Sequence, residues 1–259
     1  MTAWEEFLVG TAKRSHAVQL YRDVQELARS VAGFVSTGLA AGAPALLVAT
    51  AEHEQLFRDE LERLGWEVEQ LLDDGQLVTR DADRLLESVL RNGYPASAAF
   101  DEAVGSLLDD LLERFPGAEP RVFGEMVDIL SRRGDADAAI SLEELWNSIG
   151  WSRSFSLLCG YELDVFDAAT QRGRLPEICR THTHVRAAAD PRRLARAVDD
   201  ALDEVLGPGE AERVYLLVAG AHREEQVPAP ARVLMWVSEH LPVDADRILA
   251  AARAHYASG

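Results

Sequence analysis

The stretch GLAAGAPALLVAT, from Gly38 to Thr50, decides the fold class. It joins a glycine-flanked turn to an apolar, β-prone run at Ala45–Ala49, a pattern typical of the first strand of a nucleotide-binding α/β domain. In a phosphate-binding protein the next residues would be a glycine-rich loop ending in Gly-Lys-Ser or Gly-Lys-Thr. Here they read AEHEQLFRDELERLG, residues 51–65, with acidic side chains at Glu52 and Glu54. The sequence therefore predicts the frame of such a domain without its phosphate loop.

Alternating strands and helices are expected over most of the chain. The run SFSLLCGYEL, residues 154–163, is almost continuously apolar, which favours a strand covered on both faces as in a parallel sheet. The alternation predicts an α/β fold with a mostly parallel central sheet flanked by helices. Strands are expected at His16–Tyr21, Ala45–Ala49, 76–82, 121–123 and 154–163, and helices at 24–38, 52–64, 83–91, 100–115, 136–149 and 191–206.

The pattern changes near residue 188, which predicts a domain over residues 14–188 and a small α/β or helical appendage over 189–259. In the appendage a strand is expected at Arg213–Ala219. Two further helices are expected in PAPARVLMWVSEHL, residues 228–241, and VDADRILAAARAHY, residues 243–256.

Composition restricts the classes of partner. The net charge is −18, of which −4 falls on residues 190–259, so neither part shows the basic patch that nucleic acid or an anionic membrane requires. The first ten residues do not resemble a signal peptide, and no apolar run approaches the ~20 residues of a membrane span. Cys159 and Cys179 are expected to be reduced, which predicts a cytoplasmic protein.

Six motifs occur in one order: HAVQLY, GLAAGAPALLVAT, FGEMVDIL, LEELWN, FSLLCGYELDVF and ICRTHTHV. Together they resemble the MEDS family, the methanogen/methylotroph sensory domain, over about residues 14–188. The resemblance implies a degenerate RecA/KaiC-like fold in which RVFGEMVDIL replaces the metal-binding acidic strand of the ATPases. It also implies a domain that senses small molecules, such as hydrocarbon derivatives, and signals to a DNA-binding, kinase or anti-sigma-type output.

Several residues are predicted to bind the ligand. Glu125 and Tyr161 follow expected strands, and ligands of open α/β sheets bind beyond the carboxyl ends of the strands. Glu125 is expected to pair with a ligand, Arg121 or Arg132, since a buried carboxylate needs compensation. Trp146 is interpreted as a core residue more than a ligand platform, and Cys159 as a small buried hydrophobe. The complete set of ligand-binding candidates is His16, Tyr21, Glu125, Trp146, Tyr161 and His182, and we expect His16, Glu125 and Tyr161 to converge on one crevice.

The CRTHTH segment offers Cys179, His182 and His184 as weak candidates for zinc ligands, with His16 or Glu125 as a fourth. A helix end packed against the N-terminal strand explains the segment equally simply. No cofactor is predicted.

These features favour a non-catalytic sensor that binds a small organic ligand and contacts a regulatory protein or a second copy of itself. One alternative is a small hydrolase using His16, Glu125 and Cys159, although no nucleophile elbow is evident. Another is a transcription factor whose last two helices form a helix-turn-helix. The second of these helices begins with Asp244 and Asp246, whose carboxylates would face the phosphates of DNA.

Overall fold

A computed structural model of the 259-residue chain describes residues 3–8, 15–221 and 226–259. Residue 14, the expected start of the domain, lies outside these ranges. The chain divides into two compact units: unit 1 comprises Met1–Gln19 and Asp23–Glu162, and unit 2 comprises Leu20–Arg22 and Leu163–Gly259. The domain boundary predicted near residue 188 from the change of pattern stays a prediction.

A six-stranded sheet has the order β3-β2-β6-β7-β1-β8. The β2–β3, β2–β6 and β6–β7 pairs are all parallel. The predicted α/β fold is therefore confirmed, with the GLAAGAPALLVAT stretch supplying a strand in the interior of the sheet. The strands are β1 (His16–Tyr21), β2 (Ala45–Ala49), β3 (Leu77–Asp81), β6 (Arg121–Gly124), β7 (Ser156–Glu162) and β8 (His184–Arg186), and a separate hairpin pairs β4 (Leu90–Arg91) with β5 (Tyr94–Pro95).

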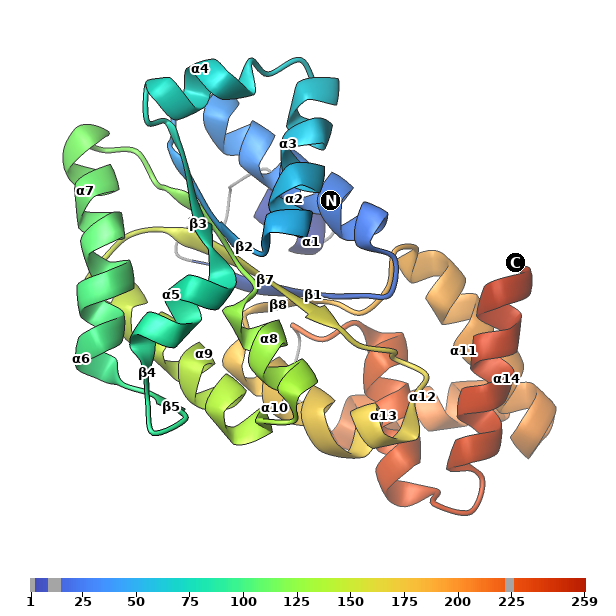
Figure 1. Cartoon of the computed structure of the whole chain (residues 1–259). Coiled ribbons are helices and arrows are strands. Elements are labelled where there is room, and N and C mark those ends of the chain that lie inside the picture. Colours follow the sequence, from blue (N-terminus) through green and yellow to red (C-terminus); the bar gives the residue numbers. More distant parts are fainter. Residues whose placement is uncertain (1–2, 9–14, 222–225) are drawn as a thin grey trace. The chain divides into compact units, whose positions relative to one another are not determined.

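Helices of unit 1 lie on both faces of the sheet, with α2 and α3 on one side and α5 and α9 on the other (Figure 1). A π-helical turn, Asp101–Gly105, joins two of them within the segment expected to be a single helix. The helices are α1 (Ala3–Leu8), α2 (Val24–Ala40), α3 (Ala51–Arg63), α4 (Val68–Asp73), α5 (Ala82–Val89), α6 (Ser97–Phe100), α7 (Ser106–Arg114), α8 (Met126–Arg133) and α9 (Ala136–Gly150).

Successive side chains of a strand point to opposite faces of the sheet, so their position along the central strands decides which helices they contact. On one face Phe123 packs edge-on against Phe57 of α3, with ring centroids 4.9 Å apart. On the other face Gly124 leaves room for the indole of Trp146 on α9. Gly160 of β7 lies beside Leu27 of α2. Its neighbours along the strand, one residue to either side, must therefore face α9.

Unit 2 is built mainly of helices, and the strand expected at Arg213–Ala219 is wrong because this segment belongs to a helix. Ala211, Val214 and Val218 are buried at helical spacing, whereas Leu216 and Leu217 are exposed. The β-prone composition of this segment was misleading, because burial follows a period of three to four residues. The helices are α10 (Leu175–Thr181), α11 (Pro191–Leu206), α12 (Glu210–Ala221), α13 (Ala229–His240) and α14 (Ala245–Ser258), with a π-helical turn at Thr170–Arg174.

Within the described ranges, every helix is too short or too polar to cross a lipid bilayer.

Two glycines of α2 provide a test of how closely this helix approaches the sheet. A Cβ at Gly38 would lie 2.4 Å from Cγ of Arg121, whose guanidinium stacks over Phe34 at 4.9 Å. We expect Gly38→Ala to lower the free energy of unfolding by about 1–3 kcal/mol, as overpacking does. Gly33→Ala meets no atom within 4 Å and should raise it by up to about 1 kcal/mol through helix propensity. Urea denaturation of both variants would check this; equal effects would contradict the close packing.

Candidate functional site

Three elements of unit 1 bring polar side chains together on the α9 face of the sheet. Residues three and four apart on a helix share a face, so Glu143, Trp146 and Asn147 of α9 all point towards the sheet. On β7 the same face carries Cys159 and Tyr161. The amide of Leu157 donates to the carbonyl of Ser15 at 2.8 Å, which places the start of β1, and with it His16, beside β7.

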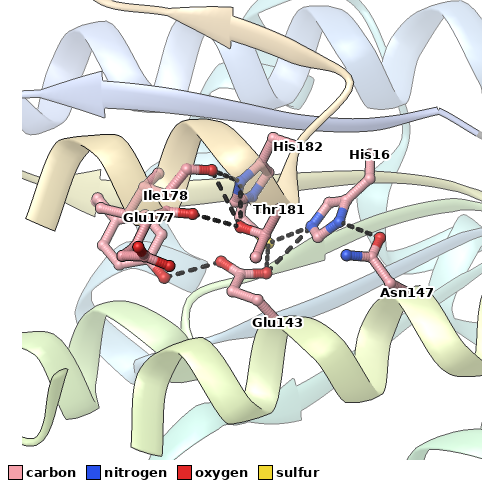
Figure 2. A network of polar contacts seen from close by, with 9 residues as sticks. His16, Glu143, Asn147, Glu177, Ile178, Thr181 and His182 are labelled. Atoms are coloured by element: carbon pink, nitrogen blue, oxygen red, sulfur yellow. Dashed lines mark hydrogen bonds and ion pairs between the residues drawn. The ribbon is translucent and has the colours of Figure 1, made fainter. Parts of the chain in front are cut away.

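These side chains form one hydrogen-bonded group, called here the α9 cluster: His16, Glu143, Asn147, Cys159 and Tyr161. Glu143 lies at its centre, 3.2 Å from Nε2 of His16, and it accepts hydrogen bonds from the Tyr161 hydroxyl at 2.8 Å and from the Cys159 thiol at 3.6 Å. His16 Nε2 is also 3.3 Å from Cys159 Sγ, and His16 Nδ1 is 2.9 Å from Asn147 Oδ1. Figure 2 shows His16, Glu143 and Asn147 pointing towards one another.

Burial decides the protonation of two members of the α9 cluster. Burial, reinforced by the nearby Glu143 carboxylate, raises the pKa of the Cys159 thiol well above its usual value, and the same two causes raise the pKa of the Tyr161 hydroxyl. Both groups are therefore protonated donors at neutral pH. A thiol beside an imidazole that contacts an amide has the layout of a cysteine nucleophile, but catalysis by such a thiol needs a lowered pKa. In this site, burial and the Glu143 carboxylate raise the pKa of the thiol instead.

Trp146 lies next to the α9 cluster in the core. It is 1% exposed and meets Phe100 and Phe155 edge-on, with ring centroids 5.1 Å and 6.2 Å apart. These contacts support its interpretation as a core residue. Its buried indole Nε1–H nevertheless has no hydrogen-bond acceptor within the described part of the chain. An unsatisfied buried donor is costly, and such groups are rare in protein interiors.

A second polar group lies where β2 leads into α3. Glu125, 1% exposed at the end of β6, accepts a hydrogen bond from the backbone N–H of Thr50 at 2.9 Å and contacts Nδ1 of His53 at 2.8 Å. A helix N-terminus that follows a β-strand is a common position for a bound phosphate in α/β proteins. In this chain the carboxylate of Glu125 lies at the start of α3.

The structure brings together only some of the predicted ligand-binding residues. His16 and Tyr161 share Glu143 as a partner, and Trp146 lies beside them. Glu125 belongs to the other polar group and contacts His53, not the expected Arg121 or Arg132. Tyr21 is five residues from His16 on the same strand, so the two side chains point to opposite faces of the sheet.

The CRTHTH segment of unit 2 does not assemble a metal site from its own residues. His182, at the C-terminus of α10, is buried and its Nδ1 lies 2.6 Å from the carbonyl of Ile178 (Figure 2). His184 Nδ1 lies 2.9 Å from the hydroxyl of Thr183. In the described ranges, neither Cys179 nor His184 belongs to a group of three or more ligand atoms close enough to hold one ion.

Sequence reasoning missed Glu143 and His53. Glu143 precedes Trp146 by three residues in LEELWN, so helical periodicity alone places its carboxylate on the buried face of α9. His53 lies in the first turn of α3 and carried no such signal. Its role depends on Glu125, which is 72 residues away in the sequence.

A comparison with protein-family models matches residues 15–183 to MEDS, the MEthanogen/methylotroph, DcmR Sensory domain. The match covers more than half of the chain and confirms the resemblance of the six motifs. A comparison with curated proteins finds no match.

The His53–Glu125 pair should titrate measurably. The hydrogen bond to Glu125 raises the pKa of His53 above 6.5, against the opposing effect of burial. Because the folded-state pKa exceeds the unfolded one, the stability from this pair is fully present below about pH 6.5 and is lost as pH rises through the folded value. We expect an NMR titration of His53 to have its midpoint above 6.5, and Glu125→Gln to lower it.

The matched control is Glu204→Gln, which removes the partner of the less buried His255. This variant should leave the His53 midpoint unchanged. A His53 midpoint at or below 6.5 in the unmodified chain would contradict the charge-assisted pair.

Proposed function

Since the chain belongs to the MEDS family of sensory domains, we propose that it is a non-catalytic sensor. It binds a small organic molecule in unit 1 and passes the signal on through protein–protein contact. The proposal keeps the cytoplasmic location predicted from the two cysteines, both of which are buried.

The observation that carries this proposal is the α9 cluster. Glu143 and Cys159 are fully buried, and His16 and Tyr161 are 6% and 1% exposed. Burying these polar groups costs desolvation free energy, and apolar side chains in the same positions would avoid that cost. A concentration of polar side chains in a sensory domain supports a binding role for this part of the interior. The adjacent indole N–H of Trp146, which has no acceptor among the described residues, supports it as well.

Charge indicates the class of ligand. The carboxylate of Glu143 and the net charge of −18 both disfavour anions. At the β2–α3 junction, Glu125 already occupies the anion position of a nucleotide-binding domain. The ligand we propose is therefore a small neutral or cationic molecule that carries one or two polar atoms, and not a nucleotide.

The same electrostatics argue against the hydrolase alternative. Its proposed members do not act together, because Glu125 contacts His53 while His16 contacts Glu143. The pKa of Cys159 is raised, so its thiol is not an activated nucleophile.

A protein partner is supported by two adjacent leucines of α12 in unit 2. Leu216 and Leu217 are 74% and 57% exposed on a helix whose other face is buried. Exposed apolar side chains grouped in this way are typical of contact surfaces. A regulatory protein or a second copy of the chain would suit this position.

Thermal unfolding tests the ligand class. The full chain is heated with millimolar short alcohols and haloalkanes, with alkylamines, or with carboxylates and Mg-ATP. We expect at least one neutral or cationic compound to raise Tm, by about 5–10 °C when its concentration is ~100 times Kd, and the anions to have no effect.

Tyr161→Phe should reduce that shift, whereas Tyr256→Phe, a matched change on α14, should preserve it. The proposed site would be contradicted if no compound of the panel raised Tm. It would also be contradicted if a compound raised the Tm of the Tyr161→Phe variant as much as that of the unmodified chain.

Thiol chemistry tests the absence of catalysis. Because the Cys159 thiol is buried and its pKa is raised, iodoacetamide at pH 7.5 should alkylate it far more slowly than in urea-unfolded chain. The measurement is intact-mass spectrometry of the Cys179→Ser variant, in which Cys159 is the remaining cysteine. Alkylation of the folded chain as fast as free glutathione would favour the enzyme reading instead.

A further inference from the structure

Three side chains of the α9 cluster present atoms that bind metals. Nε2 of His16 on β1, Oε2 of Glu143 on α9 and Sγ of Cys159 on β7 lie within 4.8 Å of one another, and all three residues are buried. The pairwise distances are 3.2 Å for N–O, 3.3 Å for N–S and 3.6 Å for O–S. All three residues belong to unit 1.

These distances agree with the edges of a tetrahedral coordination site. Zinc binds histidine nitrogen and carboxylate oxygen at about 2.0 Å and thiolate sulfur at about 2.3 Å. At tetrahedral angles such bonds place the ligand atoms roughly 3.3–3.6 Å apart, following from the same bond lengths. An ion could therefore enter between the three atoms with little movement of the elements that carry them.

Neighbouring hydrogen bonds orient two of the three ligands. When a neutral His16 carries its proton on Nδ1, Asn147 Oδ1, 2.9 Å away, can accept that hydrogen bond, and the lone pair of Nε2 is then directed towards Glu143 and Cys159. The Tyr161 hydroxyl donates to Oε1 of Glu143, which leaves Oε2 as the coordinating oxygen. Metal-binding histidines and carboxylates typically have such supporting partners.

Charge balance favours a divalent ion. A carboxylate and a thiolate buried side by side carry two negative charges, and an isolated buried charge is costly. With a neutral imidazole as the third ligand, one divalent ion makes the whole group electrically neutral. A mixture of nitrogen, sulfur and oxygen ligands is typical of Zn²⁺.

We propose that His16, Glu143 and Cys159 form a site for one Zn²⁺ ion, with a fourth coordination position that these three residues do not fill. Three protein ligands with an open position are typical of zinc sites that bind a further molecule. A neutral molecule with a lone pair, such as an alcohol or an amine, could coordinate there. Only this use of the fourth position rests on the proposed sensory function; metal binding does not.

The test measures metal content and a spectrum on the full chain. After chelation and reloading with Zn²⁺, elemental analysis should find one zinc per chain. Reloading with Co²⁺ should give the near-ultraviolet absorption of a thiolate–cobalt bond and the intense visible bands of tetrahedral cobalt. These readouts require neither enzyme activity nor a known ligand.

Variants assign the site to its ligands. Cys159→Ser should abolish the thiolate–cobalt band and weaken Zn²⁺ binding at least tenfold, and His16→Gln should weaken binding similarly. Cys179→Ser, which changes the other buried cysteine, should leave the band and the stoichiometry unchanged. Tyr161→Phe should weaken binding without abolishing it, since it removes a supporting hydrogen bond. Circular dichroism confirms that each variant folds.

Three outcomes would overturn the proposal: no stoichiometric zinc at micromolar free Zn²⁺, a cobalt spectrum of the unmodified chain without a thiolate band, or a folded Cys159→Ser variant that binds zinc as tightly as the unmodified chain. Repeating the ligand panel on metal-free and zinc-loaded chain separates this proposal from the sensory one. Zinc binding without any ligand shift would leave the metal site intact and contradict only the proposed function.

Discussion

The buried carboxylate of Glu143 is the constraint on which the interior of unit 1 depends. A carboxylate with no exposed surface must be compensated by the protein around it. Its compensation comes from two separate strands: the imidazole of His16 lies on β1, and the thiol of Cys159 and the hydroxyl of Tyr161 lie on β7. Replacing Glu143 alone would leave those donors without their acceptor. The polar centre therefore links the position of α9 to two neighbouring strands.

Among the described residues of unit 1, two glutamates are buried, and they are compensated in different ways. Glu125 accepts a backbone N–H from the start of α3 and pairs with His53, whose pKa is raised by this contact. A backbone donor and an imidazole therefore compensate its charge. Glu143 accepts hydrogen bonds from a thiol and a phenol and contacts the imidazole of His16. The proposed ligand and metal ion both use this second group.

Local patterns predicted much of the fold. The apolar runs at His16–Tyr21 and Ala45–Ala49 are strands with the expected bounds, and Pro191–Leu206 is the expected helix. The segment from Arg213 to Ala219 was misread because its β-prone composition hid helical burial. In the site, His16 and Tyr161 were predicted from their motifs, and they do share a partner. The identity of that partner depends on how α9 packs against β1 and β7, over separations of up to 131 residues. Residue spacing within one segment does not contain this information.

The two polar groups of unit 1 differ in what they leave available for binding. In nucleotide-binding α/β domains, phosphates bind where a strand leads into a helix, because backbone N–H groups face them there. At the corresponding junction between β2 and α3, this chain places the carboxylate of Glu125, whose negative charge disfavours an added anion. Under the proposed function, recognition therefore uses side chains on the α9 face of β7 and β1. The carboxylate of Glu143 on that face favours a neutral or cationic ligand over a phosphate.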